Sequence, residues 1–344
     1  MRTFYSESHR LHFPQGEISG GEMVTPYERP SRIEYILRRL QQQHMTDIVA
    51  PDEVDFAPIR RLHDPGFLDF LENAWEEWVA DGYAGEIIPT SFPVRRMPGQ
   101  LRPPKDIDGK AGYYALAAET AITAGTWEAA QSSCASAQSA QRKVAAGADA
   151  AFALCRPPGH HAASDMFGGY CFINNASVVA EMFRMDGAAK VAILDIDFHH
   201  GNGSQDIFYG RDDVFFASLH GHPEDAFPYF SGYADEIGMG VGEGYNANYP
   251  MRPGTSYEVW VKSLHDAIKR IQKFGAEALV ISLGVDAFKD DPISFFKLES
   301  ESFKQAGKEI AKLKLPTVFV MEGGYAIEAV GINTVNVLEG FVGA

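Results

Sequence analysis

Five short apolar runs recur from residue 150 onward, and a cluster of polar residues closes or follows each of them. The runs are AAFALC (150–155), KVAILDID (190–197), DVFFASLH (213–220), EALVISLGVD (277–286) and TVFVMEGGY (317–325). They are nearly continuous and rich in β-branched and aromatic residues, as expected of parallel strands that are buried on both faces. Because parallel strands are joined by helical crossovers, the pattern predicts an α/β fold with a mostly parallel central sheet flanked by helices.

Helical segments are predicted between and before these runs. Residues 255–275 are amphipathic, with Thr255 and Glu258 placed to form a capping box and Gly275 placed just beyond the end. Residues 111–151 are rich in Ala, Ser and Gln but keep helical spacing, so we interpret them as helices. Residues 80–108 are instead dense in Gly and Pro and show no sustained period, which predicts a long loop.

The chain has 344 residues, of which 45% are hydrophobic, a size that fits one large α/β domain or two smaller ones. It contains no apolar run of about 18 residues and does not begin like a signal peptide, so we expect no membrane span. Its three cysteines, Cys134, Cys155 and Cys171, form no CxxC pair. This usage favours free thiols and a location in the reducing cytoplasm.

The charge balance of the chain is strongly acidic. The formal net charge is −16 at pH 7, and the sequence pI is about 5.1. Such a surface repels nucleic acid and anionic membranes and favours the approach of cationic small molecules. Acidity alone is common among ordinary enzymes, so it supports a cationic substrate only weakly.

Polar side chains gather where the predicted strands end. They are His160, His161, Asp195, Asp197, His199, Ser218, His220, Asp286 and Tyr325. In open α/β sheets, ligands bind at the carboxyl ends of the strands. The sequence therefore predicts an active site assembled from the loops at this edge.

The segment LDIDFHHGNG contains the strongest indication of a metal site. Side chains alternate in an extended segment, so Asp195, Asp197 and His199 face the same side. Crowded carboxylates are costly unless a cation binds them, and Asp286 is placed to supply a further ligand. These donors suit Zn²⁺, with Fe²⁺ or Co²⁺ as substitutes. An Asp-x-Asp pair alone is also common at capping or ion-pair sites, and His200, on the other side, fits a buried structural histidine.

The adjacent His160 and His161 suit acid–base chemistry beside such a cation. A metal lowers the pKa of its bound water to about 7, yet that water still needs a base. One imidazole can be that base while a second, differently partnered imidazole shifts its pKa. Without a metal nearby, the same pair would simply hydrogen-bond to loop backbone. Tyr325, which Gly323 and Gly324 allow to project from a sharp turn, can stabilise an oxyanion.

Taken together, these motifs resemble a known family. RPPGHHA, GYCFINNA, DIDFHHGNG, SLH, LGVDAF and EGGY are similar to the histone deacetylase superfamily of arginase-like fold. SFPVRR, DMFGGYCFINN and DPISFFKL bring the resemblance closer to its acetylpolyamine amidohydrolases. The similarity runs along the whole chain. It implies a single deacetylase domain over residues 1–344, an eight-stranded parallel sheet and a Zn²⁺-dependent amidohydrolase acting on linear amides.

The resemblance also implies roles for individual residues. The implied metal ligands are Asp197, His199 and Asp286. The implied catalytic residues are His161 as general base and acid, His160 as its electrostatic partner held by Asp195, Tyr325 as the group that polarises the acetyl carbonyl, and Asn202 as the group that orients His161. Many histone deacetylases carry Asp in place of Asn202. Because a neutral amide supports an imidazolium less well, we expect a lower pKa for His161 here.

Binding sites for K⁺ and for the substrate are implied as well. One K⁺ site is implied near Asp195, Asp197, His199, Ser218 and Leu219, and a second near Phe208, Arg211, Val214 and Tyr245. The implied substrate-binding residues are Gly169, Tyr170 and Phe227 beside the methylene chain, and Glu17 and Glu119 near a distal ammonium. An alkyl chain between two aromatic faces buries apolar surface, which gives this arrangement a physical reason.

The closer resemblance implies a homodimer in which residues 80–108 narrow the channel mouth. A narrow mouth admits slender acetylated amines such as N-acetylputrescine, N-acetylcadaverine or acetylspermidine and excludes folded protein. The alternatives are a protein acetyl-lysine deacetylase with an open rim and a non-catalytic sensor of acetylated amines. A dinuclear manganese ureohydrolase is disfavoured because only one set of three ligands is evident.

Overall fold

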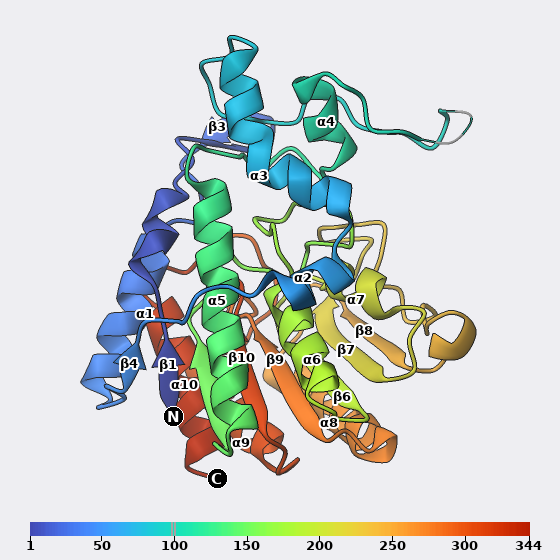
Figure 1. Ribbon diagram of the computed structural model, residues 1–344. Coiled ribbons are helices and arrows are strands. Elements are labelled where there is room, and N and C mark those ends of the chain that lie inside the picture. The colour runs from blue at the N-terminus through green and yellow to red at the C-terminus, as the bar shows by residue number, and fades with distance from the viewer. Residues whose placement is uncertain (98, 100) are drawn as a thin grey trace.

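The centre of the molecule is a sheet of eight strands, and every pair of neighbouring strands in it is parallel. The computed structural model describes residues 1–97, 99 and 101–344. In this part of the chain the strand order is β4-β1-β5-β10-β9-β6-β7-β8. The strands are β1 (Arg2–Phe4), β4 (Ile48–Val49), β5 (Ala150–Ala153), β6 (Val191–Asp195), β7 (Val214–Gly221), β8 (Asn246–Met251), β9 (Ala278–Leu283) and β10 (Thr317–Met321). The predicted eight-stranded parallel sheet is confirmed (Figure 1).

All five predicted apolar runs form strands, namely β5, β6, β7, β9 and β10. Every residue of β6, β7, β9 and β10 is buried, which explains why these runs lack the alternation of a half-exposed strand. The other three strands carry no comparable signal. β4 has only two residues, and β8 contains Pro250, which an edge strand tolerates because it lacks a neighbour on one side.

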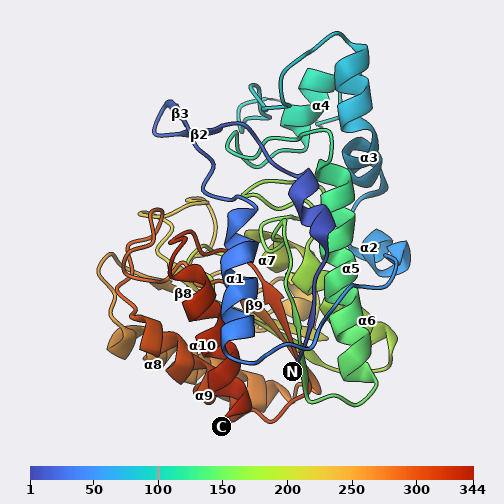
Figure 2. The ribbon, with the colours of Figure 1, turned by 90° about the vertical axis from the view of Figure 1, so that its left-hand side faces the viewer.

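Helices cover both faces of the sheet and give three layers, seen edge-on in Figure 2. One face carries α1 (Ser31–Gln42), α8 (Tyr257–Phe274), α9 (Ser300–Ala311) and α10 (Val330–Val342). The other carries α2 (Phe56–Leu62), α5 (Thr126–Ala145), α6 (Asn175–Met185) and α7 (Asn202–Phe208). Beyond the carboxyl ends of the strands lie α3 (Pro65–Ala80), α4 (Ile107–Tyr113) and the antiparallel hairpin of β2 (Glu17–Ser19) and β3 (Glu22–Val24). Two short 3₁₀ helices are η1 (Glu7–Leu11) and η2 (Gly240–Gly242).

The connections place chemically important strands side by side although they are distant in sequence. β9 and β10, the last two strands, insert between β5 and β6. In the registers, Asp195 of β6 pairs with Ser282 of β9, and Leu283 of β9 pairs with Met321 of β10. The ends of these strands are therefore nearly level, so the residues that follow them meet at one edge.

The helix predicted over residues 255–275 is present, but its start differs from the prediction. Its apolar side chains, from Trp260 to Phe274, recur every three or four residues and are buried. Gly275 ends it in the left-handed conformation, with φ 78°, as predicted. The predicted capping box is wrong, because the Thr255 hydroxyl donates to the Arg252 carbonyl and the Glu258 carboxylate accepts from the Ser256 hydroxyl.

The helical prediction over residues 111–151 is only partly correct. α4 ends at Tyr113 and α5 begins at Thr126, and the residues between them form no helix. This connection is pinned by isolated bridges from Ala115 to Phe167 and from Ile122 to Ile87. α5 itself is built mainly from Ala, Ser and Gln, and most of these side chains are buried against α6 and the sheet. Small side chains allow this close approach.

The predicted loop over residues 80–108 corresponds to the connection between α3 and α4, part of which projects away from the rest of the molecule (Figure 1). Residues 98 and 100 of it lie outside the described residues. Among the helices that the structure describes, none combines the length and apolar character needed to cross a membrane. The three cysteines are buried and free.

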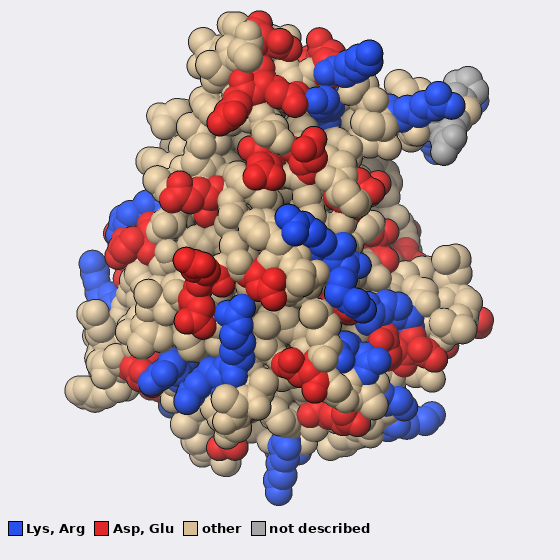
Figure 3. All heavy atoms as spheres, viewed as in Figure 1, with Lys and Arg blue, Asp and Glu red and all other residues tan. Residues whose placement is uncertain are grey.

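Acidic side chains gather at the end of the molecule where α3 lies, as Figure 3 shows for one face. Asp69, Glu72 and Glu76 are exposed on this helix. The carboxyl ends of the strands point toward the same end (Figure 1). Part of the negative charge of the chain is thus located near the edge where the sequence predicts a site, which favours the approach of cations.

Candidate active site

Most of the residues predicted from strand ends converge at one edge of the sheet, whereas Ser218 and His220 lie inside β7. Asp195 ends β6, and Asp197 and His199 follow it. The loop after β9 brings Asp286, and the loop after β10 brings Tyr325. His160 and His161 come from the loop between β5 and α6. Because β5, β10, β9 and β6 are consecutive in the sheet, four loops meet over a few strand widths.

Three buried side chains form a compact group of possible metal ligands. The ligand atoms of Asp197, His199 and Asp286 all lie within 4.8 Å of one another. His199 Nδ1 is 3.0 Å from Asp286 Oδ2 and 3.4 Å from Asp197 Oδ1. Gly323 N donates to Asp197 Oδ2 at 2.8 Å, and a Cβ at position 323 would lie only 2.6 Å from that oxygen. The glycine before Gly324 and Tyr325 is therefore needed for this close approach.

The electrostatics of this group favour a bound cation. Burial and the neighbouring Asp197 carboxylate raise the pKa of Asp286 to about 8. Burial acts to lower the pKa of His199, but hydrogen bonds to Asp197 and Asp286 and their charges outweigh it and raise that pKa to about 10. Two carboxylates and one imidazole match the donor set of Zn²⁺ sites that keep a position open. The residues therefore fit a single divalent cation.

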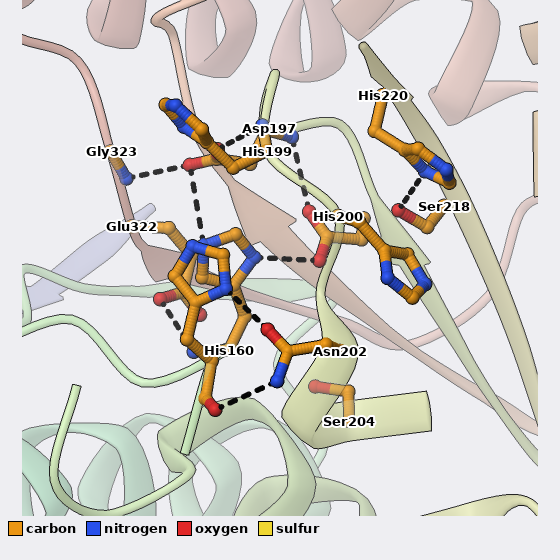
Figure 4. A network of polar contacts seen from close by, with 12 residues as sticks. His160, Asp197, His199, His200, Asn202, Ser204, Ser218, His220, Glu322 and Gly323 are labelled. Carbon is orange, nitrogen blue, oxygen red and sulfur yellow. Dashed lines mark hydrogen bonds and ion pairs between the residues drawn. The ribbon is translucent and has the colours of Figure 1, made fainter. Parts of the chain in front are cut away.

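A second group, His160, Cys171 and Glu322, is also close enough to hold a cation. One ring nitrogen of His160 and one carboxylate oxygen of Glu322 already have partners, because His160 Nδ1 is 2.9 Å from Asp195 Oδ2 and Glu322 Oε2 accepts from Gly159 N at 2.7 Å. Burial raises the pKa of the Cys171 thiol well above its usual value. This group is thus suited to positioning His160 rather than to binding a metal (Figure 4).

The two adjacent histidines have opposite protonation preferences. Burial disfavours a charged His160, but the Asp195 and Asp197 carboxylates outweigh it and raise the His160 pKa to about 10. The pKa of His161 is well below its usual value because the ring is buried and faces His160 and His199. A charged imidazole therefore lies beside a neutral one, with ring centroids 4.1 Å apart.

Asn202 orients His161 through two contacts. His161 Nδ1 is 2.7 Å from Asn202 Oδ1, and Asn202 Nδ2 donates to the His161 carbonyl at 3.3 Å. Since the amide oxygen only accepts, Nδ1 carries the proton and Nε2 is left as the basic nitrogen. The predicted low pKa of His161 agrees with the structure, but burial is its largest cause. The hydrogen bond to Asn202 acts in the other direction and raises the pKa.

Tyr325 is fixed at its backbone and beside its ring. Its N–H donates to Asp291 Oδ2 at 2.7 Å. The buried Arg32 donates to the carbonyls of Glu322 and Gly324, at 2.6 and 2.7 Å, and its guanidinium lies 4.9 Å from the Tyr325 ring centroid. Burial raises the pKa of Tyr325 well above its usual value, so the phenol stays a neutral hydrogen-bond donor.

A cavity of about 330 Å³ leads to this group of residues. It is lined by His161, His199 and Tyr325 together with all five predicted substrate-binding residues, namely Glu17, Glu119, Gly169, Tyr170 and Phe227. The Phe227 ring lies 5.2 Å from the His161 ring, and the Tyr170 ring lies 5.6 Å from the Tyr325 ring, both edge-on. Aromatic side chains thus flank His161 and Tyr325.

Glu17 and Glu119 support the cavity wall as well as face the cavity. The Tyr170 hydroxyl donates to Glu17 Oε1 at 2.7 Å, and Gly169 N donates to Glu119 Oε1 at 2.9 Å. Glu17 is buried rather than exposed, and burial raises its pKa to about 7. Tyr170 adopts a positive φ of 68°, and its N–H donates to the Thr120 hydroxyl.

Other predicted residues lie behind the cavity rather than on its wall. Ser218 and His220 are inside β7, where the Ser218 hydroxyl is 2.8 Å from His220 Nδ1 (Figure 4). His200 is buried and its Nε2 is 3.1 Å from Gln205 Oε1, consistent with a structural histidine.

The residues of the second predicted K⁺ site, around the α7–β7 junction, are mostly engaged in other contacts. Arg211 N donates to the Phe208 carbonyl at 3.0 Å, and Phe216 N donates to the Tyr245 carbonyl at 3.0 Å. Val214 begins β7.

The sequence analysis did not single out several residues that shape the site. Arg32 and Asp291 hold the Tyr325 loop, and Tyr229, Ile293 and Phe295 line the cavity. None of them belongs to a run of metal-ligating or acid–base residues, and Arg32 is about 290 positions away from the loop that it contacts. The only local signal was the segment DPISFFKL, which contains Asp291 and two of the lining residues.

Comparison with known proteins decides the family. Residues 26–341 match the histone deacetylase domain. The chain belongs to this family. The prediction of a hydrolytic enzyme of the histone deacetylase superfamily is thereby confirmed, and the shared domain covers nearly the whole chain.

Three relatives are similar along their full length. The chain is 56% identical to the acetylpolyamine amidohydrolase of Mycoplana ramosa, with 100% of both chains covered. It is 52% identical to acetylpolyamine amidohydrolase 1 of Pseudomonas aeruginosa, covering 100% of this chain and 99% of the relative. The crystal structure of an acetylpolyamine aminohydrolase from Burkholderia pseudomallei matches with a TM-score of 0.93 and 39% identity, over 99% of this chain and 98% of that one.

Metal binding is expected to release protons near neutral pH. Asp286 and His199, with pKa values raised to about 8 and about 10, bind a cation only after losing their protons. Affinity for Zn²⁺ should therefore rise with pH up to about pH 10, and more steeply below about pH 8 than above it. Calorimetry of Zn²⁺ binding to metal-free protein, in two buffers of different ionisation enthalpy, measures the released protons.

Loss of a residue that only hydrogen-bonds to a metal ligand lowers metal affinity by roughly 10–100-fold. Asp286→Ala removes a ligand itself, so it should weaken Zn²⁺ binding by more than that. His265→Ala is a matched control, because His265 of α8 pairs with Glu309 of α9 at a distance of 2.8 Å and is not one of the three ligands. Equal affinity of wild type and Asp286→Ala, or binding without proton release, would contradict the assignment.

Proposed function

We propose that the chain hydrolyses the acetamide of small N-acetylated polyamines and diamines in a Zn²⁺-dependent reaction, releasing acetate and the free amine. The observation that carries the proposal is the cavity that places His161, Tyr325 and the metal-ligand group at one point between aromatic walls. Full-length identities of 56% and 52% to two acetylpolyamine amidohydrolases support the substrate class. N-acetylputrescine, N-acetylcadaverine and acetylspermidine are the substrates that we expect.

Asp197, His199 and Asp286 would hold the Zn²⁺, which when bound polarises a carbonyl and lowers the pKa of a water molecule. His161 Nε2 takes the proton of the attacking water and returns it to the amine nitrogen as the C–N bond breaks. His160, kept charged by Asp195, stabilises the negative charge that develops and keeps the His161 pKa low.

The Tyr325 hydroxyl is the proposed donor to the acetyl oxygen. Its raised pKa keeps the proton on the phenol, and Asp291 and Arg32 fix the loop that carries it. A donor held in place before the reaction stabilises the oxyanion without reorganisation.

The walls and mouth of the cavity fit a slender cationic amine. Tyr170 and Phe227 offer apolar faces to a methylene chain, while Gly169 allows the backbone to pass close to His161. Glu17 and Glu119 are the proposed partners of a distal ammonium, each with a carboxylate already anchored by two hydrogen bonds. The acidic balance of the chain agrees with such a ligand.

Three further expectations stay proposals. Residues 80–108 contact a second subunit in a homodimer and narrow the mouth, and the chain is cytoplasmic, in line with its free cysteines. K⁺ ions bind near Asp195, Asp197, His199, Ser218 and Leu219 and near Phe208, Arg211, Val214 and Tyr245. The pairing of Asp195 with Ser218 on adjacent strands brings the first set together.

A substrate panel on metal-defined protein tests the proposed function, with acetate release as the readout. We expect kcat/KM for acetylated diamines to exceed that for acetyl-lysine peptides by about tenfold or more, since the wrong substrate leaves charged groups unpaired. A neutral N-alkylacetamide of equal length is the control for the distal ammonium. Preference for peptides would favour a protein deacetylase, and binding without acetate release would favour a sensor.

Tyr325→Phe should keep Zn²⁺ and substrate binding but lose kcat by about 100-fold or more, because only the transition-state hydrogen bond is removed. His161→Ala should behave alike, and both are compared by kcat and KM on N-acetylputrescine. Unchanged turnover in either variant would contradict the role assigned to that residue.

A further inference from the structure

The loop that carries Tyr325 is tied to the loop that carries His161 by one buried carboxylate. Glu322 follows β10 and is 0% exposed. Its Oε2 accepts hydrogen bonds from Gly159 N at 2.7 Å and from His160 N at 3.2 Å. The loop after β10 is thus joined to the loop after β5 immediately before His161 (Figure 4).

Gly159 is itself packed tightly against the start of α6. A Cβ at this position would lie 2.5 Å from Asn175 N and 2.9 Å from the Ile173 carbonyl, so only glycine fits. The N–H group that Glu322 accepts from therefore belongs to a closely packed segment of the backbone. The contact is therefore part of the packing and not a flexible surface pair.

The backbone around Glu322 extends the same connection. Its carbonyl accepts from Arg32 Nη2 at 2.6 Å, and its N–H donates to the Leu283 carbonyl at 3.0 Å. The next residue, Gly323, donates to Asp197 at 2.8 Å. A shift of Glu322 would therefore move His161 and Tyr325 together. It would also move the Gly323 N–H group that donates to the Asp197 carboxylate.

Stability alone does not explain a carboxylate at this position. Glu322 Oε1 is buried and has no hydrogen-bond partner among the described residues. Burying such an oxygen is unfavourable, and an apolar side chain of the same size would avoid that cost. The two backbone N–H groups, on the other hand, need an acceptor between the loops.

We propose that Glu322 is a positioning residue that sets the distance and orientation of His161 relative to Tyr325. The inference rests on the proposed function, since it concerns the base and the oxyanion donor of that reaction. Glu322 touches neither group directly and acts through the backbone of residues 159 and 160. We call the two hydrogen bonds from Gly159 N and His160 N to Glu322 Oε2 the clamp. Misplacement of a reacting group by about 1 Å can cost about 100-fold in rate, so loss of the clamp affects kcat.

The test compares Glu322→Gln with Glu322→Met in the zinc-loaded full chain. The Gln side-chain oxygen still accepts both N–H groups, so we expect kcat within about threefold of wild type. The Met side chain has similar size but accepts neither, so we expect kcat to fall by about tenfold to 100-fold with KM within about twofold. Acetate release from N-acetylputrescine gives both constants, and metal analysis gives the Zn²⁺ content.

Gln138→Ala is the matched control. Gln138 is also 0% exposed and also holds backbone of another segment, accepting from Asp55 N and donating to the Asp55 carbonyl at 2.8 and 2.7 Å. It lies on α5, outside the cavity. Its loss should lower the melting temperature and leave kcat unchanged, which separates positioning from general stability.

The outcomes distinguish the clamp from the proposed function. A wild-type chain that releases no acetate from any acetylated amine contradicts the proposed function. If the wild type is active, each of three results contradicts only the clamp. Glu322→Met is as active as the wild type, Glu322→Gln is as impaired as Glu322→Met, or Glu322→Met loses its zinc. If Glu322→Met does not fold, Glu322→Ala replaces it, and failure of both to fold would assign Glu322 to stability and overturn the proposal.

Discussion

The carboxylates of Asp197 and Asp286 are buried close together, and most of the site is organised around the cost of that arrangement. Each accepts a backbone N–H, from Gly323 and from Phe198, and His199 lies between them. These contacts do not remove the repulsion, because the pKa of Asp286 is still raised to about 8. A divalent cation would remove it, and the two strand ends that deliver the ligands are adjacent only because β9 inserts beside β6.

Around the metal-ligand group, one residue is charged and two are neutral, and this combination suits acid–base chemistry at neutral pH. Asp195 keeps His160 charged, and this charge together with burial keeps His161 neutral with Nε2 as its basic nitrogen. Tyr325 keeps its proton for the same reason that His161 lacks one, since burial disfavours the charged form of each. A neutral base and a neutral donor therefore face the same end of one cavity.

Much of this arrangement could be predicted from the sequence, because its signals are local. Continuous apolar runs predicted the buried strands, and the polar residues after them predicted the edge where Asp197, His199 and Asp286 meet. Contacts between distant segments had no such signal: Arg32 contacts the Tyr325 loop across 292 positions of the sequence, and Glu322 contacts Gly159 across 163 positions. The cause of the low His161 pKa was also missed, since burial is a tertiary property, and the edge strands were too short or too irregular to recognise.

The central claim is that one divalent cation, held by Asp197, His199 and Asp286, is required for cleavage of the amide. The most direct measurement adds Zn²⁺ stepwise to metal-free protein and follows acetate release from N-acetylputrescine. The account predicts activity that rises in proportion to bound Zn²⁺ and levels off at about one ion per chain. Equal activity after exhaustive chelation, or activity that keeps rising well beyond one bound ion, would contradict it.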